Sequence, residues 1–231
     1  VSGGKVIEPL HDGGYGIWWA NVDSSVCFEQ LYVNGVRAVR ARTPNKDDSL
    51  PRIYMNASRW VLHPDSTVQN ITIAVNDRGY FKDLMTQGDF EIVVFKDWTT
   101  SRFRAIGIHS DPAEIVLKPP FCLSENTYNS IFATDANHYS LFMEGDPSFL
   151  DQPGEWVLDR LSNKLFYKPL PGEVLNQTTA IAAIQDQLIR ITGTREKPVK
   201  NLNFNNISFQ HIAYILPVSS YDGSQASFCY P

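Results

Sequence analysis

Alternation of apolar and polar residues is the feature that most restricts how this chain can fold. A period of two places side chains on alternate faces of a β-strand, whereas a helix needs a period of 3.6. Four stretches have strand character: residues 68–75 (VQNITIAV), 90–95 (FEIVVF), 103–108 and 114–117. Helical periodicity is confined to residues 80–85 and 147–150, each sufficient for about one turn. The sequence therefore predicts an all-β fold.

A β-hairpin is predicted over residues 156–167. The segments WVLD and KLFY flank residues 160–163, which have the composition of a turn. Asn163 can adopt the positive φ that such a turn requires, because asparagine tolerates the left-handed region better than most residues.

A short phrase occurs twice near the C-terminal end, as Asn-Leu-Asn-Phe over residues 201–204 and as Asn-Ile-Ser-Phe over residues 206–209. In a right-handed parallel β-helix, short strands alternate with tight bends, and asparagine fits a bend because it tolerates left-handed φ. Residues 188–193 and 199–209 are therefore predicted to be strands of one coil, with bends at the asparagines. One coil buries little, because repeat folds need at least about three units. We expect this coil to pack on further coils or on a partner chain.

Five blocks of the chain resemble, in order, the N-terminal half of large right-handed parallel β-helix proteins related to glycoside hydrolases, including fucosidase-like and lacto-N-biosidase-like members. The blocks are VSGGKVI (1–7), FEQLYVNGVRAVRARTPN (28–45), DFEIVVFKDWTTSRFR (89–104), DQPGEWVLDRLSNKLFYKPLPGE (151–173) and PVKNLNFNNISFQH (198–211). The resemblance implies that residues 1–7 and 188–231 form the first coils of the helix. It also implies that residues 8–187 form an inserted β-rich module, barrel-like or sandwich-like. Asn163 departs from the family, which usually has glycine in that hairpin turn.

The same resemblance implies a secreted (extracellular or periplasmic) carbohydrate-active protein whose partner is a glycan or polysaccharide. Glycoside hydrolysis generally needs two carboxylates that flank the scissile bond. In the resembled enzymes these carboxylates project from later coils, so the catalytic residues are expected outside this chain. A non-catalytic protein that uses the scaffold for carbohydrate binding or assembly is the alternative. A polysaccharide lyase is less favoured because it would need an acidic Ca²⁺ cluster or a basic catalytic residue.

Two groups of residues are candidates for sugar contacts in the first part of the chain. Trp18 and Trp19 could stack on the C–H face of a pyranose. The favoured alternative is that one tryptophan fills the core while its neighbour covers an edge. Arg40 and Arg42 share one face of a predicted strand and could hold a carboxylate or sugar hydroxyls. Here an internal ion-pair network with acids such as Asp97 or Glu91 is the favoured alternative.

Three further candidates lie near the C-terminal end. His211 follows the doubled phrase, where it could hydrogen-bond a glycan, although a histidine in this position is more often a bend residue. Tyr221 and Asp222 are expected in a loop that could reach into a glycan-binding groove of the predicted β-helix.

Composition limits the partners and the chemistry. A net charge of −5 and a pI near 5.5 argue against nucleic-acid and anionic-membrane partners, and no apolar stretch reaches the ~18 residues of a membrane span. No cofactor or metal is expected, because the histidines and cysteines lack metal-ligand spacing. The cysteines are predicted to be small buried hydrophobes, and no disulfide pairing is assigned among Cys27, Cys122 and Cys229. Four sequons favour a secreted protein. Glycosylation is expected at Asn56, Asn70 or Asn176, whereas Asn206 is expected to be an unmodified bend residue.

Overall fold

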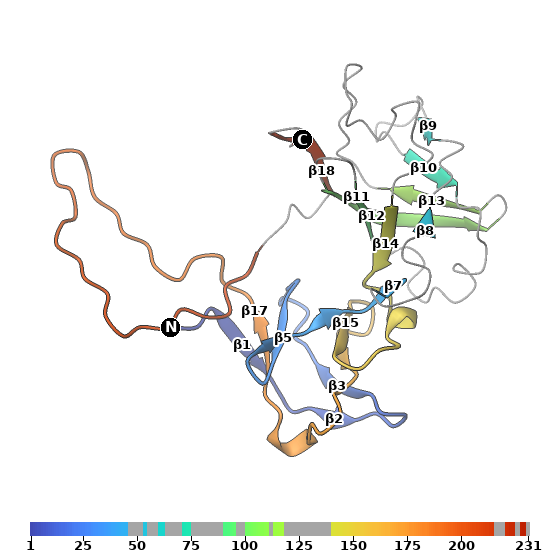
Figure 1. Ribbon diagram of the computed structural model, residues 1–231, viewed down its shortest axis with the longest axis horizontal. Helices are drawn as coiled ribbons and strands as arrows, with labels where there is room; N and C mark the ends of the chain where they lie inside the picture. Colours follow the sequence, from blue (N-terminus) through green and yellow to red (C-terminus); the bar gives the residue numbers. More distant parts are fainter. Residues whose placement is uncertain are drawn as a thin grey trace. The chain divides into compact units, whose positions relative to one another are not determined.

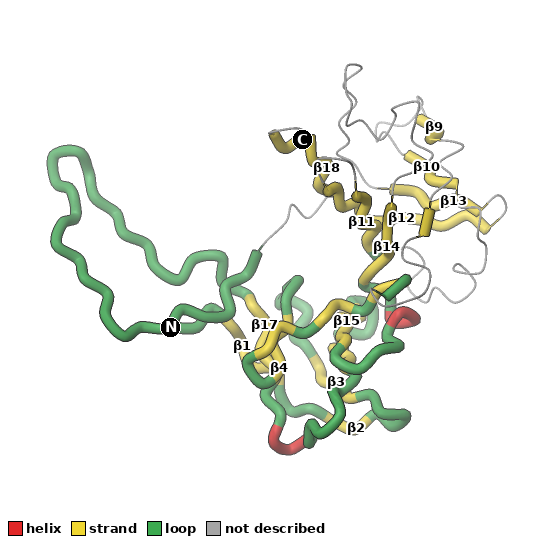
Figure 2. Tube along the Cα trace, viewed as in Figure 1, coloured by secondary structure: helices red, strands yellow, loops and turns green. Residues whose placement is uncertain are grey.

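The computed structural model of the chain is dominated by β-strands (Figure 1). It describes residues 1–45, 53–54, 60–62, 71–74, 90–95, 100–110, 113–117, 140–214, 220–224 and 227–229. Within the described residues, two single-turn 3-10 helices, η3 (Pro147–Phe149) and η4 (Leu175–Gln177), interrupt the strands and loops (Figure 2). The all-β prediction is confirmed, and η3 matches the turn predicted at residues 147–150. No helix among the described residues is long and apolar enough to cross a membrane. The turn expected at residues 80–85 lies outside the described residues.

The chain divides into two compact units. Unit 1 comprises residues 1–39, 153–156 and 162–215, and unit 2 comprises residues 40–152, 157–161 and 216–231. The chain therefore leaves unit 1 and returns to it twice. The boundaries expected from the resemblance, with an inserted module over residues 8–187, remain a prediction.

Unit 1 contains a four-stranded antiparallel sheet in the order β1 (Gly4–Ile7), β17 (Ala180–Ala183), β4 (Leu31–Val33), β5 (Val36–Arg37). A two-residue turn at Asn34 and Gly35, both with positive φ, joins β4 to β5. Asn-Gly is the preferred sequence for such a turn because both central residues need left-handed backbone. The turn fixes the register, so Tyr32 lies opposite Arg37.

A five-stranded sheet follows the order β2 (His11–Asp12), β3 (Trp18–Asn21), β16 (Lys164–Tyr167), β15 (Glu155–Asp159), β6 (Val39–Arg40). Strands β15 and β16 form the hairpin that was predicted from residues 156–167. Asn163 has φ 53°, the positive value expected for it.

The core of unit 1 is aromatic. Phe28 stacks on Trp156 with ring centroids 5.3 Å apart, and Trp18 lies 6.1 Å from Tyr167. The Trp156 and Tyr167 side chains are almost completely buried. Burial of these aromatic side chains is expected to be the main source of stability of unit 1, because removing apolar surface from water is the dominant favourable term in folding.

The described residues of unit 2 include a ten-stranded sheet. Its main path runs β7 (Arg42–Thr43), β14 (Ser140–Glu144), β11 (Glu91–Phe95), β12 (Thr100–Ser110), β13 (Ala113–Leu117), β10 (Ile71–Ala74), β9 (Trp60–Leu62). Three strands pair beside this path: β8 (Ile53–Tyr54) with β14, β18 (Ser220–Ser224) with β12, and β19 (Ser227–Cys229) with β18. The apolar run of β11 is buried from Ile92 to Val94, and Phe90 packs edge-on against Phe149.

Residues 186–209, called here the extended segment, project from unit 1 after β17 and return close to the N-terminus (Figure 1). Seven of its apolar side chains are 43–55% exposed: Ile189, Ile191, Val199, Leu202, Phe204, Ile207 and Phe209. The segment was expected to form strands, but it forms no named strand within the described residues. An extended backbone becomes a strand only beside a hydrogen-bonding neighbour, and most of this segment has none in unit 1.

Pairing of the extended segment with the N-terminus occurs only at its end. Ser2 forms a parallel bridge with Gln210, and the N-terminal amine donates to the Ser208 carbonyl at 2.7 Å. A second parallel bridge joins Gln185 to Ile212. By contrast, strand β1 pairs antiparallel with β17, which was not anticipated.

Candidate functional site

The two candidate tryptophans occupy different environments in unit 1. Trp18 is buried in the core, whereas Trp19 lies on the opposite face of β3. The Trp19 ring stacks on His11 at 4.5 Å, and Lys164 Nζ lies 4.4 Å from its centroid. Trp19 therefore already has an aromatic and a cationic partner, and the two tryptophans do not form a joint stacking platform.

Arg40 belongs to an ion-pair cluster on the sheet of unit 2. Its Nη1 lies 2.8 Å from Glu91 Oε2 and 3.3 Å from Glu144 Oε1. Arg102 bridges the same two glutamates from β12, and Arg104 lies 3.3 Å from Glu91 Oε1. Gly145 makes room for this arrangement, because a Cβ there would lie 2.7 Å from Arg40 Nη2.

Arg42 is placed differently from Arg40. Its guanidinium carbon lies 5.5 Å from the centre of the Phe142 ring, and its Nε is buried without a hydrogen-bond partner among the described residues. The two arginines therefore do not act as a pair. Arg40 is held by carboxylates, and Arg42 packs over an aromatic ring.

Glu91 and Glu144 lie directly opposite each other on β11 and β14, so the structure brings two carboxylates together. Like charges in this position repel, and the bridging arginines offset that repulsion. Burial on its own would raise the pKa of Glu91, but the guanidinium groups outweigh it and lower the pKa. A glycosidase needs one protonated carboxyl group as the general acid, so this pair is suited to holding the sheet together rather than to catalysis.

Glu173 is a second occupied carboxylate. Its Oε2 accepts hydrogen bonds from the Tyr167 hydroxyl and the Leu170 amide, both at 2.8 Å, and its Oε1 accepts one from Asn34 Nδ2 at 3.1 Å. Burial and the hydrogen bond to Glu173 raise the pKa of Tyr167. Glu173 thus ties the turn after β16 to the hairpin turn of β4 and β5.

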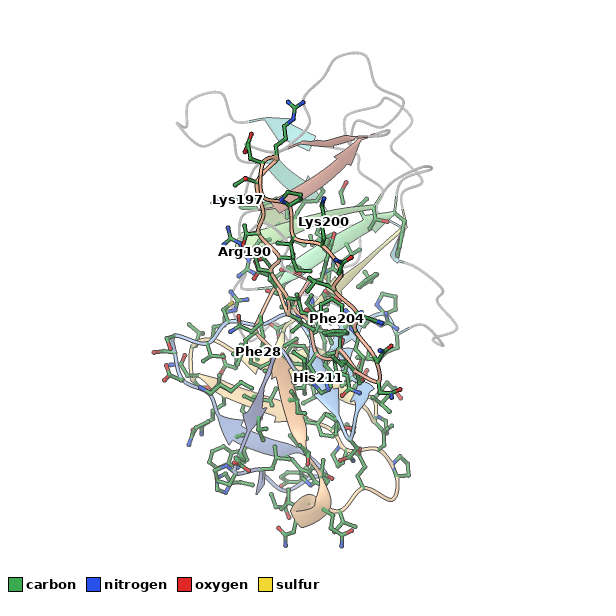
Figure 3. The ribbon with its side chains drawn as sticks, turned by 90° about the vertical axis from the view of Figure 1, so that its left-hand side faces the viewer. Phe28, Arg190, Lys197, Lys200, Phe204 and His211 are labelled. Carbon is green, nitrogen blue, oxygen red and sulfur yellow. The ribbon has the colours of Figure 1, made fainter. Side chains whose placement is uncertain are left out.

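His211 lies at the foot of the extended segment, below Phe204 in Figure 3. Its Nδ1 is 2.9 Å from Ser2 Oγ, and its ring meets Tyr32 edge-on at 4.9 Å. Its backbone has φ 56°, which is unusual for a residue with a side chain. The His211 ring is therefore held beside Tyr32 of β4, in the four-stranded sheet of unit 1.

The backbone of His211 also belongs to a series. Asn201, Asn206 and His211 have φ values of 59°, 55° and 56° at intervals of five residues. The expected left-handed bends at the two asparagines are therefore confirmed. Each is followed by an aliphatic, a small and an aromatic residue, so His211 to Tyr214 is a third copy of the phrase. The third copy was missed because histidine replaces the asparagine at its first position.

Tyr221 and Asp222 belong to strand β18 rather than to a loop. Tyr221 pairs with Arg102 of β12, and Asp222 pairs with Cys229 of β19. The loop prediction was wrong because the segment finds an edge of the sheet to pair with, which sequence alone does not reveal. These two residues and His211 belong to different units.

The sequon and cysteine predictions have mixed outcomes. Asn176 is exposed in η4, and Asn206 is exposed at its bend, whereas Asn56 and Asn70 lie outside the described residues. Cys27 is exposed and free, so its predicted burial was wrong. It follows a turn in which Asp23 accepts hydrogen bonds from Ser25, and this turn carries the chain along the surface.

Comparison with known proteins finds a matching family and a similar solved structure. A family model, the GH141 insertion domain, matches residues 16–170. A solved structure described as a glycoside hydrolase matches with a TM-score of 0.68 and 23% sequence identity. The match covers 92% of this chain and 36% of that one, so this chain spans about a third of the length of that structure. No curated protein matches. At this identity the structural match shows a shared fold.

Proposed function

The chain belongs to the GH141 insertion domain family, and on this premise we propose that it is part of a secreted glycoside hydrolase and acts on a glycan. The observation that carries the proposal is the family match over residues 16–170. The glycoside hydrolase with the same fold is longer than this chain, which is consistent with a larger enzyme.

In this proposal the chain supports the active site and does not supply the catalytic carboxylates. Glu91, Glu144 and Glu173 are held by arginine, tyrosine or backbone donors. A catalytic pair needs one carboxyl group that keeps its proton near neutral pH and a second that stays ionised. We therefore assign catalysis to carboxylates outside residues 1–231.

The extended segment supports the proposed parallel β-helix. Its left-handed bends recur at five-residue intervals, and its apolar side chains are uncovered. Coils of this kind are stable only when neighbouring coils cover them. We propose that further coils of the same polypeptide cover the segment, with a partner chain as the alternative.

The experiment is to incubate the full-length protein with soluble neutral and carboxylated polysaccharides and to measure released reducing ends. The proposal expects hydrolysis of at least one glycan, and loss of that hydrolysis when acids on coils outside this chain are changed to their amides. Glu91→Gln, normalised to folded protein, serves as the internal comparison and should retain turnover. Glycan binding without hydrolysis would favour the alternative function, a non-catalytic carbohydrate-binding protein. Loss of turnover in folded Glu91→Gln would refute the assignment of catalysis elsewhere.

A further inference from the structure

The four-stranded sheet of unit 1 has one buried and one open face. The buried face carries small and aliphatic side chains: Ile7, Leu31, Val33, Ala180 and Ala182. The open face carries one continuous row across all four strands: Val6, Ile181, Tyr32 and Arg37. Each of these residues lies directly opposite the next, and the row extends over three strand spacings, about 14 Å.

The row combines apolar and polar groups on an accessible surface. Val6 is 47% exposed, Ile181 and Tyr32 are partly buried, and Arg37 is exposed. Arg37 makes no ion pair with any described residue, so its guanidinium donors are available. This differs from Arg40 and Arg102, which share two glutamates.

His211 is fixed beside the row. The Gly4 amide donates to Ser2 Oγ, and the same oxygen lies 2.9 Å from His211 Nδ1, a contact in which either group can donate according to the histidine tautomer. When the Ser2 hydroxyl donates to Nδ1, the neutral imidazole carries its proton on Nε2, where it can be donated to a ligand. Gly4 allows the close approach, because a Cβ at this position would lie 2.2 Å from Ile181 Cγ2 and 3.1 Å from His211 Cβ.

We propose that this face, formed by Val6, Ile181, Tyr32, Arg37 and His211, is a glycan-binding subsite. A pyranose offers an apolar C–H face and a rim of hydroxyl groups. The aliphatic and aromatic side chains match the first, and the Arg37 and His211 donors match the second. Arg37 can also bind a carboxylate in two-point geometry, so carboxylated sugars should bind more tightly than neutral ones. The inference rests on the proposed glycan function but concerns binding, and it is independent of where catalysis occurs.

The test uses the full-length protein in native affinity electrophoresis. The gels contain arabinoxylan, xyloglucan or galactomannan as neutral probes, and polygalacturonate or alginate as carboxylated probes. Tyr32→Ala should weaken binding by about fivefold to tenfold. Arg37→Gln should weaken binding mainly to the carboxylated probes. Arg37 is on the surface, so this variant is expected to fold normally even if Tyr32→Ala does not.

Matched controls separate the face from general surface effects. Tyr15 is fully exposed in another turn of unit 1, and Arg195 is exposed in the extended segment, so Tyr15→Ala and Arg195→Gln should bind like the wild type. Equal binding by folded Tyr32→Ala, folded Arg37→Gln and these controls would overturn the inference, as would absence of binding to every probe. Tyr32-dependent binding without hydrolysis would support the subsite and contradict the enzymatic proposal. Hydrolysis with an unchanged KM in Tyr32→Ala and Arg37→Gln would support the enzymatic proposal and contradict the subsite.

Discussion

Glu91 provides the most direct test of how the sheet of unit 2 is held together. Its side chain is 13% exposed and accepts from three arginines, at 2.8 Å from Arg40, 3.0 Å from Arg102 and 3.3 Å from Arg104. Glu91→Gln keeps the shape but removes the charge, so Glu144 is left to balance several guanidinium groups. Removing one member of a buried ion pair costs about 3–5 kcal/mol. The residual exposure places the expected loss near the lower end, at about 3 kcal/mol.

The Glu91 carboxylate should also determine part of the decrease in the free energy of unfolding at acid pH. Because the folded pKa of Glu91 lies below its ordinary value of 4.5, its contribution is fully present above that value and is lost as pH falls through the folded pKa. Glu91→Gln should therefore destabilise unit 2 at pH 7 and flatten the loss of stability below about pH 4.5.

Urea unfolding at several pH values, followed by hydrogen exchange in peptides from β11 and β12, measures both effects. In thermal unfolding the variant should lower the midpoint of unit 2 by about 10 °C. Glu196→Gln is the matched control, because Glu196 is exposed in the extended segment, and its effect should stay within about 0.5 kcal/mol. If the two variants unfold alike at pH 7, the cluster does not stabilise the sheet as argued.

Three further outcomes follow from unit 1. Tyr167 has a raised pKa, so its contribution to the stability of unit 1 is present below about pH 10 and is lost at higher pH. Tyr167→Phe should therefore reduce the loss of stability at alkaline pH, as measured by thermal unfolding between pH 9 and 11. Gly4→Ala should destabilise unit 1 by about 1–3 kcal/mol through overpacking, whereas Gly107→Ala, whose Cβ would meet only ordinary contacts at 3.6 Å, should not show this clash; equal effects in urea unfolding would contradict the argument. In protein from a eukaryotic secretory pathway, peptide mapping should find Asn206 unmodified even where Asn176 carries a glycan, because further coils are proposed to cover the extended segment. Deamidation at Asn206 after glycosidase treatment would contradict that covering.

Local patterns predicted the strands well because strand formation follows from alternation and turn chemistry. Residues 90–95 and the hairpin at 156–167 needed only those signals, and the left-handed asparagines of the doubled phrase needed only the conformational preference of their side chains. The Asn34-Gly35 turn carried an equally strong signal, and it would have revealed that Tyr32 faces Arg37.

Long-range pairing could not be predicted in the same way. Nothing near residues 220–224 indicates that they pair with β12, and nothing near Glu91 indicates that Glu144 lies opposite it. Such contacts depend on which edges and faces remain open once the rest of the sheet has formed. The same holds for the candidate site, since His211 was singled out from sequence while its neighbours Ser2 and Tyr32 come from the other end of the chain.

The pairing of β1 with β17 also affects how the protein is made. Ile7 and Ala180 are partners, yet they lie about 170 residues apart in the chain. At a synthesis rate of about 5–20 residues per second, the first strand waits roughly 9–35 seconds on the ribosome before its partner has been added. During that time most of unit 2 emerges and can begin to fold, while the first strand has an unpaired edge. A chaperone that binds nascent chains would therefore find a target in strand β1, and premature release would leave unit 1 open while much of unit 2 is already folded.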